Sequence, residues 1–363
     1  MNKEELFSKI MSLAPTSYEH LDYRVHLSNV LKQYLSLIRE LNVEDMPEQW
    51  DVVIKECEGL IAAIKETVKR VYMGQHSSAY NILRKRLYGL PQFHLYAGFR
   101  VNSEFFRMRV FDSNVEDDPC SKEMFHIPFD KRGIVKTERY STPGYPCLYL
   151  GLSSYVCWEE MNRPNLDKCY VSRLHSRKEI TTLNMSLPLH EEWNTNEDSF
   201  IGSIVRFPLI ISSMICVKNR SDFFKPEYII PQLIMEWIIE LQRKKEMQEK
   251  PIGVFYTSIH INHGFNYPDY VYNNLAIPAQ SPFSGRYSKE LCDIFEISEP
   301  TSDELERAKG TQNRADNIYL PPKNPTDEDI KIHNYKVSAF GTIERALFQR
   351  ENEYPLRSLN YAE

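Results

Sequence analysis

The residues of this sequence that are best suited to chemistry lie in one block, residues 139–160. Arg139 is followed by the pair Pro143-Gly144, which favours a tight turn. Tyr149 comes ten residues after Arg139, and Glu160 comes eleven residues after Tyr149, directly behind Glu159. A turn, a strand and a helix in this order can bring a guanidinium group, a phenol ring and a carboxylate together.

These three kinds of side chain suit a pyridine dinucleotide. Arg139 can hold a pyrophosphate through two parallel hydrogen bonds, and Tyr149 can face a nicotinamide ring. Glu160 can bond a ribose hydroxyl and stabilise positive charge that develops at the anomeric carbon. Each residue also has an ordinary explanation, as a loop-bracing arginine, a half-buried strand tyrosine and an acid near a helix start. Only their spacing favours the functional interpretation.

The block resembles the RES-domain family of bacterial NAD-degrading toxins. The family pattern is an arginine, a Pro-Gly turn, a Leu-Tyr-Leu strand and a helix with a glutamate, and this chain has Leu148-Tyr149-Leu150 as its strand. The spacing of the family favours Glu160 over Glu159 as the acting carboxylate. The resemblance extends over residues 104–278 and is strongest over residues 139–160.

Members of this family also carry an arginine in an early strand and a serine in a late one. In this sequence the segment 104–111 supplies Arg107 and Arg109, and the segment 253–258 ends in Ser258. By the resemblance we expect NAD to be bound by Arg107 and Ser258, with Arg109, Tyr140 and Glu159 as further candidates. Taken alone, the two arginines are also compatible with solvent-facing strand positions, and Ser258 with a strand-end hydroxyl.

The resemblance implies an α+β fold of the ADP-ribosyltransferase type, with a mixed sheet and a cleft, that uses NAD as substrate without a metal. It implies an NAD glycohydrolase or phosphorylase that cleaves the nicotinamide–ribose bond and acts as a toxin or defence effector. Two alternatives stay open: transfer of ADP-ribose to a protein, and a non-catalytic module that senses NAD or binds a partner. Because an unrestrained enzyme would drain cellular NAD, we expect an inhibitor, either an antitoxin protein or residues 1–90.

The elements around the block fall into three segments. Apolar residues spaced three and four apart predict helices at 27–41, 50–71 and 77–90. Beyond residue 91, short runs rich in Val, Ile, Phe and Tyr alternate with Pro, Gly and Asn, as is typical of strands and turns. We therefore predict an N-terminal helical region (1–90), a RES-like NAD-binding domain (91–298), and a linker with a C-terminal segment that docks on the core (299–363).

Within the predicted NAD-binding domain, two helices stand between the strands. One begins at Ser153 or Ser154, whose hydroxyls suit a helix N-cap, and reaches Met161. The other covers about 227–248. The predicted strands lie at 104–111, 147–151, 169–174, 253–258 and 272–277.

Composition narrows the functional classes. Hydrophobic residues make up 42% and charged residues 26%, which are globular values, and the net charge of −6 gives no basic field for nucleic acid. No apolar run approaches the roughly 18 residues of a membrane helix, and the acidic start lacks a secretory signal. Seven cysteines without a C-x-x-C pair indicate a reducing cytoplasm. Whether the chain forms a homo-oligomer is left open.

Overall fold

The computed structural model describes residues 1–19, 21–41, 47–90, 95–111, 119–244, 250–260, 266–280, 285–308, 322 and 325–362. The chain divides into two compact units. Unit 1 holds residues 1–97, 136–143 and 181–254, and unit 2 holds residues 98–135, 144–180 and 255–363. The α+β class is confirmed, whereas the likeness to ADP-ribosyltransferases stays a prediction. The predicted segments 1–90 and 299–363 lie wholly in unit 1 and unit 2 respectively, and 91–298 contributes to both.

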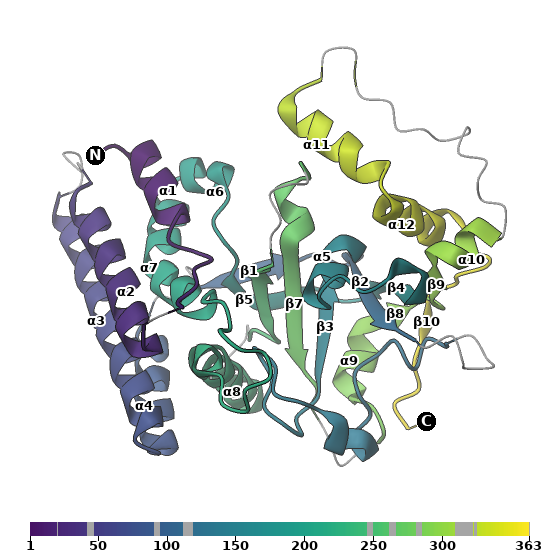
Figure 1. Cartoon of the computed structure of the whole chain (residues 1–363), viewed down its shortest axis with the longest axis horizontal. Coiled ribbons are helices and arrows are strands. Elements are labelled where there is room, and N and C mark those ends of the chain that lie inside the picture. The colour runs from purple at the N-terminus through teal and green to yellow at the C-terminus, as the bar shows by residue number, and fades with distance from the viewer. Residues whose placement is uncertain are drawn as a thin grey trace. The chain divides into compact units, whose positions relative to one another are not determined.

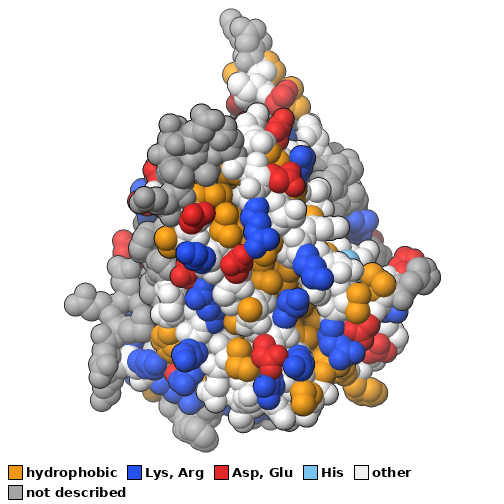
Figure 2. All heavy atoms as spheres, turned by 90° about the vertical axis from the view of Figure 1, so that its left-hand side faces the viewer, with side chains coloured by type: hydrophobic (Ala, Val, Ile, Leu, Met, Phe, Trp, Pro, Cys, Tyr) orange, Lys and Arg blue, Asp and Glu red, His pale blue; other side chains and the backbone are white. Residues whose placement is uncertain are grey.

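Unit 1 is mainly helical (Figure 1). Its long N-terminal helices carry one apolar face each, as the three-four spacing predicts. On the face drawn in Figure 2, charged side chains of both signs lie among apolar ones. The helices are α1 (Lys3–Met11), α2 (Tyr23–Arg39), α3 (Pro47–Tyr72), α4 (His76–Tyr88), α6 (His190–Thr195), α7 (Glu197–Ser213) and α8 (Ile229–Arg243).

Helix α7 is the buried centre of unit 1. All of its residues from Phe200 to Ser213 are buried, and α2, α3 and α8 all contact it. The hydroxyl of Tyr34 donates to the carbonyl of Ile204 at 2.6 Å, and Trp50 stacks on Phe200 with ring centroids 5.7 Å apart. The N-terminal helices therefore form part of the core of this unit.

Two strands begin or end at the unit boundaries, β1 (Tyr96–Phe99) and β5 (Ile180–Met185). Within unit 1, the backbone N–H of Asn184 donates to Leu95 at 2.7 Å, and that of Leu183 donates to Gly253 at 2.9 Å. These bonds tie the β5 segment to the chain on both of its edges.

Unit 2 is built on a sheet with the strand order β6-β7-β3-β2-β4-β8-β10, and β9 pairs with β4. Every strand predicted from the sequence is present, within three residues at each end. The strands are β2 (Glu104–Val110), β3 (Cys147–Gly151), β4 (Cys169–Ser176), β6 (Val254–Thr257), β7 (Asn273–Pro278), β8 (Phe295–Ile297), β9 (Thr301–Ser302) and β10 (Arg357–Ser358). The helices are α5 (Ser154–Glu160), α9 (Lys289–Ile294), α10 (Asp303–Ala308), α11 (Asp327–Lys336) and α12 (Ala339–Gln349).

One face of this sheet packs against α5 and α12. Phe106 and Met108 of β2 join Tyr155 of α5 and Phe340 of α12 in one buried cluster. Because side chains alternate along a strand, Phe105 points to the opposite face, where its ring lies 5.9 Å from that of Phe295. Among the residues described, no helix is both long and apolar enough to cross a membrane.

The C-terminal segment contributes regular structure to unit 2. The predicted linker and C-terminal segment (299–363) contain β9 and α10, and residues 309–321, 323, 324 and 363 of that prediction lie outside the described part of the chain. After Tyr335, helix α12 contributes Phe340, Ile343 and Leu347 to the buried cluster that also contains Tyr155 of α5. This segment therefore helps to position α5.

Candidate active site

Tyr149 and α5 lie on the same face of the unit 2 sheet. Gly151 shows the direction, because a Cβ atom there would lie 2.5 Å from Val156 Cγ1 and 2.7 Å from Cys157 Sγ, both on α5. Only a glycine lets the helix approach the strand so closely. Tyr149 lies two residues before Gly151 in β3 and is half-buried, so its side chain projects from the same face.

Glu160 is the last residue of α5 and is partly exposed. The side-chain N–H of Asn274 in β7 donates to Glu160 Oε1 at 2.9 Å. Asn274 is paired with Gly151 in the sheet, and Ala276 is paired with Tyr149. Unit 2 therefore brings Tyr149 and Glu160 to one face of the β3–β7 pair.

Glu159 has different surroundings from its neighbour. Its side chain is 3% exposed, one carboxylate oxygen accepts from the hydroxyl of Tyr155, and the other accepts from Arg163 Nε at 2.8 Å. Both oxygens thus hold the end of α5 in place. Glu160, by contrast, is partly exposed.

Arg107 and Arg109 occupy the part of unit 2 where β2 and β3 are joined by a single residue pair, Phe106 with Gly151. The guanidinium of Arg107 donates to the carbonyl of Tyr149 at 2.7 Å. Burial, and secondarily the charge of Arg109, lowers the pKa of Arg107 to about 9. Arg109 donates to a backbone carbonyl at 3.0 Å, and burial lowers its pKa as well. The Arg107 guanidinium therefore lies at the backbone of Tyr149, and that of Arg109 is near enough to affect the pKa of Arg107.

His126 lies near both arginines. Burial, opposed by a hydrogen bond to the carbonyl of Ile127 and reinforced by the charges of Arg107 and Arg109, lowers its pKa to about 4. Its Nε2 atom accepts from the backbone N–H of Ser288 at 2.8 Å, so the neutral ring carries its proton on Nδ1. The imidazole is a neutral part of the core and not an additional cation.

Ser258 follows β6 directly and is 1% exposed. Its backbone N–H donates to Tyr272 at 2.9 Å, and its hydroxyl oxygen accepts from the backbone N–H of His260 at 3.0 Å. The preceding Thr257 donates to the side chain of Asn273 at 2.7 Å. These bonds hold Ser258 beside Tyr272, the residue that precedes β7.

Arg139 and Tyr140 belong to unit 1. The guanidinium of Arg139 donates to the carbonyls of Ser213 and Ile215 and lies over the ring of Tyr228, 5.3 Å from its centroid. Tyr140 is 1% exposed. Of the predicted site residues, unit 2 therefore contains Tyr149, Glu159, Glu160, Arg107, Arg109 and Ser258.

The sequence interpretation missed Asn274. The available signal was a pair of asparagines at the start of an otherwise apolar strand, because buried amides require specific partners. Asn273 and Asn274 find those partners in Thr257 and Glu160.

Comparison with known proteins gives one similarity to a curated protein. No family model matches the sequence, and no solved structure matches it. The chain is 36% identical over 266 residues to the protein named "Putative toxin YopC" of Bacillus subtilis (strain 168). The match covers 69% of this chain and 57% of that protein, so the chain spans less than two thirds of its relative's length. This similarity agrees with the toxin part of the sequence prediction.

Proposed function

We propose that this chain is a toxin that consumes NAD by cleaving the bond between nicotinamide and ribose, with the reaction centre in unit 2. The observation that carries the proposal is the placement of Tyr149 and Glu160 on one face of the β3–β7 pair, with Asn274 holding the carboxylate. The similarity to a protein named as a toxin supports the biological setting.

The proposed reaction follows from the side chains. Tyr149 faces the nicotinamide ring, and the positive charges of Arg107 and Arg109, whose side chains alternate with Phe106 and Met108 along β2, attract the pyrophosphate through space and not by direct contact. When the C–N bond breaks, its electron pair neutralises the nicotinamide ring, and the ribose becomes an oxocarbenium-like cation that the Glu160 carboxylate stabilises. Water or phosphate then attacks the anomeric carbon, and the proton of water passes to solvent or to the carboxylate.

Two of the predicted residues take modified roles in this proposal. Both oxygens of Glu159 are engaged with Tyr155 and Arg163, which favours a structural role for it. Arg139 is held by backbone carbonyls within unit 1, which favours a structural role for it in that unit.

The test is release of nicotinamide from NAD by the purified full-length chain, with and without phosphate. We expect Glu160→Gln to abolish release, and Glu179→Gln, which changes an exposed glutamate of unit 2, to leave it unchanged. NAD labelled in its adenosine part separates the acceptors, because only transfer to a protein leaves label on protein. No release above that of Glu160→Gln would remove the proposal.

An enzyme that cleaves NAD must be kept inhibited in the cell that makes it, because it would otherwise drain that cell's NAD. We propose that an inhibitor protein supplies this restraint, as for an antitoxin. Co-purification from the native host under mild conditions, followed by mass spectrometry, tests this: the expected partner suppresses nicotinamide release when it is added back.

A further inference from the structure

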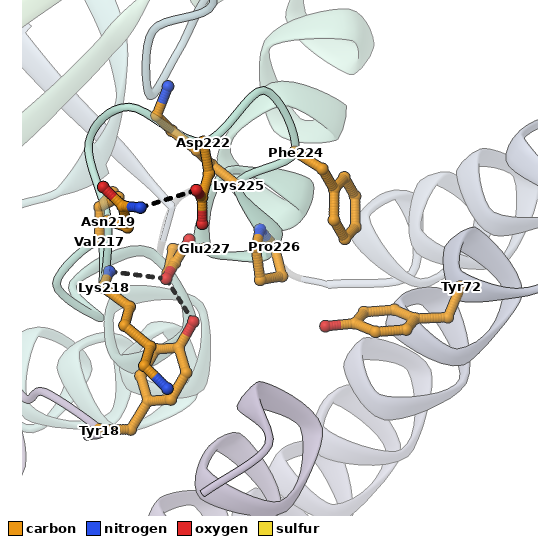
Figure 3. A pocket seen from close by; sticks show the side chains of 10 residues that line it. All are labelled: Tyr18, Tyr72, Val217, Lys218, Asn219, Asp222, Phe224, Lys225, Pro226 and Glu227. Atoms are coloured by element: carbon orange, nitrogen blue, oxygen red, sulfur yellow. Dashed lines mark hydrogen bonds between the residues drawn. The ribbon is translucent and has the colours of Figure 1, made fainter. Parts of the chain in front are cut away.

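Unit 1 contains a pocket with no part in the proposed reaction. Its volume is about 280 Å³, and it lies between the loop 217–227, the ring of Tyr18 and the ring of Tyr72 on α3 (Figure 3). Phe224 forms a further aromatic wall, with its ring edge-to-face with Tyr72 at 5.6 Å. A space of this size exceeds that of a single water molecule several-fold.

Glu227 lies within this lining and is 1% exposed. Its Oε1 atom accepts from the hydroxyl of Tyr18 and, at 3.1 Å, from the backbone N–H of Lys218 (Figure 3). Its Oε2 atom is buried and has no hydrogen-bond partner among the residues that the structure describes. A buried carboxylate with an oxygen that lacks a donor is costly, so a cation bound in the pocket beside Glu227 would lower that cost.

The surroundings favour a cationic donor. A charged N–H group binds a carboxylate about twice as strongly as a neutral one, and aromatic walls stabilise organic cations. The chain already places its own cations on two of these rings: Arg24 lies 4.5 Å from the centroid of Tyr72, and the Lys218 ammonium lies 5.8 Å from that of Tyr18. The buried hydroxyl of Tyr23 also has no partner in the described part of unit 1, and burial, with the charge of Glu227 as a second cause, raises its pKa.

The basic residues of the pocket do not reverse this preference. Lys218 is exposed, and Lys225 is partly exposed, so solvent screens both ammonium groups. Asp222, also exposed and bonded to Asn219 at 2.8 Å, offsets part of their charge. The one deeply buried charge of the pocket is the carboxylate of Glu227, among the lining residues.

We propose that this pocket binds a guanidinium or ammonium group on an aliphatic stem, with the cation drawn to the carboxylate of Glu227 and the stem packed between Tyr18, Tyr72 and Phe224. Such a group can come from a small organic amine or from an arginine or lysine side chain of a polypeptide. None of the residues of this pocket is among those proposed to cleave NAD.

The experiment measures binding to the full-length chain by saturation-transfer NMR and calorimetry. The probes are agmatine, a capped Ala-Arg-Ala tripeptide and inorganic phosphate. We expect agmatine to bind and phosphate not to bind. Tripeptide binding as well would identify a polypeptide side chain as an acceptable source, and its absence would restrict the site to small amines.

The variants locate the interaction. Glu227→Gln keeps an oxygen for Tyr18 and Lys218 but removes the charge, so cation affinity should fall about tenfold or more. Glu191→Gln, which changes an exposed glutamate of unit 1 outside the pocket lining, is the matched control and should leave affinity unchanged. Phe224→Ala alters a side chain that is 55% exposed, so it should fold normally and weaken binding several-fold.

Three results would overturn the proposal: no binding of either cation, equal binding by Glu227→Gln, or a preference for phosphate. Nicotinamide release by Glu227→Gln should equal that of the unaltered chain if the chain is active. Because binding is measured without NAD, failure of this site and failure of the proposed reaction are distinguishable.

Discussion

Two adjacent glutamates at the end of α5 differ in what their carboxylates touch. Glu159 is buried against Tyr155 and Arg163, whereas Glu160 is partly exposed and is held by Asn274. A glutamate whose oxygens are used within the fold contributes to stability. Glu160 is the glutamate to which the proposed reaction assigns the contact with substrate. The pair therefore offers a comparison of structural and functional roles within one helical turn.

We predict that Glu159→Gln lowers the free energy of unfolding by about 1–3 kcal/mol, because it removes the charge that Arg163 pairs with in a buried position. Nicotinamide release by Glu159→Gln should fall by only a few-fold. Urea denaturation followed by circular dichroism, alongside the activity assay, checks both. A Glu159→Gln variant with unchanged stability and no activity would reverse the assignment of roles.

His126 predicts a pH dependence of stability. Its pKa in the folded chain is about 4, below the ordinary histidine value near 6.5, so the unfolded chain binds more protons between these values. The free energy of unfolding should therefore fall as the pH drops from about 6.5 to about 4. The titration of His126 accounts for up to about 3 kcal/mol of this fall.

The measurement is urea unfolding across pH 4–8 for the unaltered chain and for His126→Gln. The glutamine does not titrate, so its variant should show a shallower dependence. Equal slopes in the two proteins would show that other groups cause the effect.

At the scale of elements, helix α5 is fixed at both ends by side chains from other parts of unit 2. At its start, Glu344 of α12 accepts hydrogen bonds from the backbone N–H of Ser154 at 2.7 Å and from its hydroxyl at 2.8 Å, and a third from Tyr335. Burial raises the pKa of Glu344. At the other end, Asn274 holds Glu160.

We predict that Glu344→Ala destabilises the chain by about 3 kcal/mol or more, because three buried donors lose their acceptor. Glu344→Gln keeps an acceptor oxygen and should cost less. Hydrogen exchange of the α5 amides gives the local readout: faster exchange is expected in Glu344→Ala, with the glutamine variant between it and the unaltered chain. Unchanged α5 protection in Glu344→Ala would show that α12 does not fix this helix.

The elements that the sequence predicts best are those with one exposed face. The helices predicted at 27–41, 50–71 and 77–90 are present as α2, α3 and α4. Apolar residues spaced three and four apart form a single face in a helix, so this pattern predicts a helix reliably. Helix α7 escaped prediction because it is buried on all sides, so its sequence has no polar stripe, and Pro208 lies inside it. Strand β5 was missed as well, since its polar residues Thr181, Thr182 and Asn184 obscure the apolar alternation.

The candidate site was predictable where one strand and one helix carry it. The sequence placed Tyr149 in a strand and Glu160 at the end of the next helix, and both placements are confirmed. Spacing could not show that Asn274 would hold Glu160 or that Arg107 would bond the carbonyl of Tyr149, because these contacts join segments far apart in the chain. Nor could it show that Arg139 belongs to a different unit.

At the scale of the whole molecule, the N-terminal helices bear on the idea that residues 1–90 restrain the activity. Tyr34 and Trp50 bind helix α7, whose residues from Phe200 to Ser213 are all buried. Deleting residues 1–90 would therefore expose an apolar helix to water. A loss of toxicity in such a truncation would report unfolding of unit 1 and would not test autoinhibition.

We predict that the fragment 91–363 is produced mainly as aggregated protein, because uncovered α7 surface is a contiguous apolar patch of the kind that drives association. The soluble fraction and size-exclusion profile of the fragment check this beside Tyr34→Phe, which removes only one hydrogen bond to α7 and should stay soluble. A monodisperse fragment that retains the helix content of residues 91–363 would contradict the packing argument. In that case its nicotinamide release, compared with that of the full chain, would become a valid measure of restraint by residues 1–90.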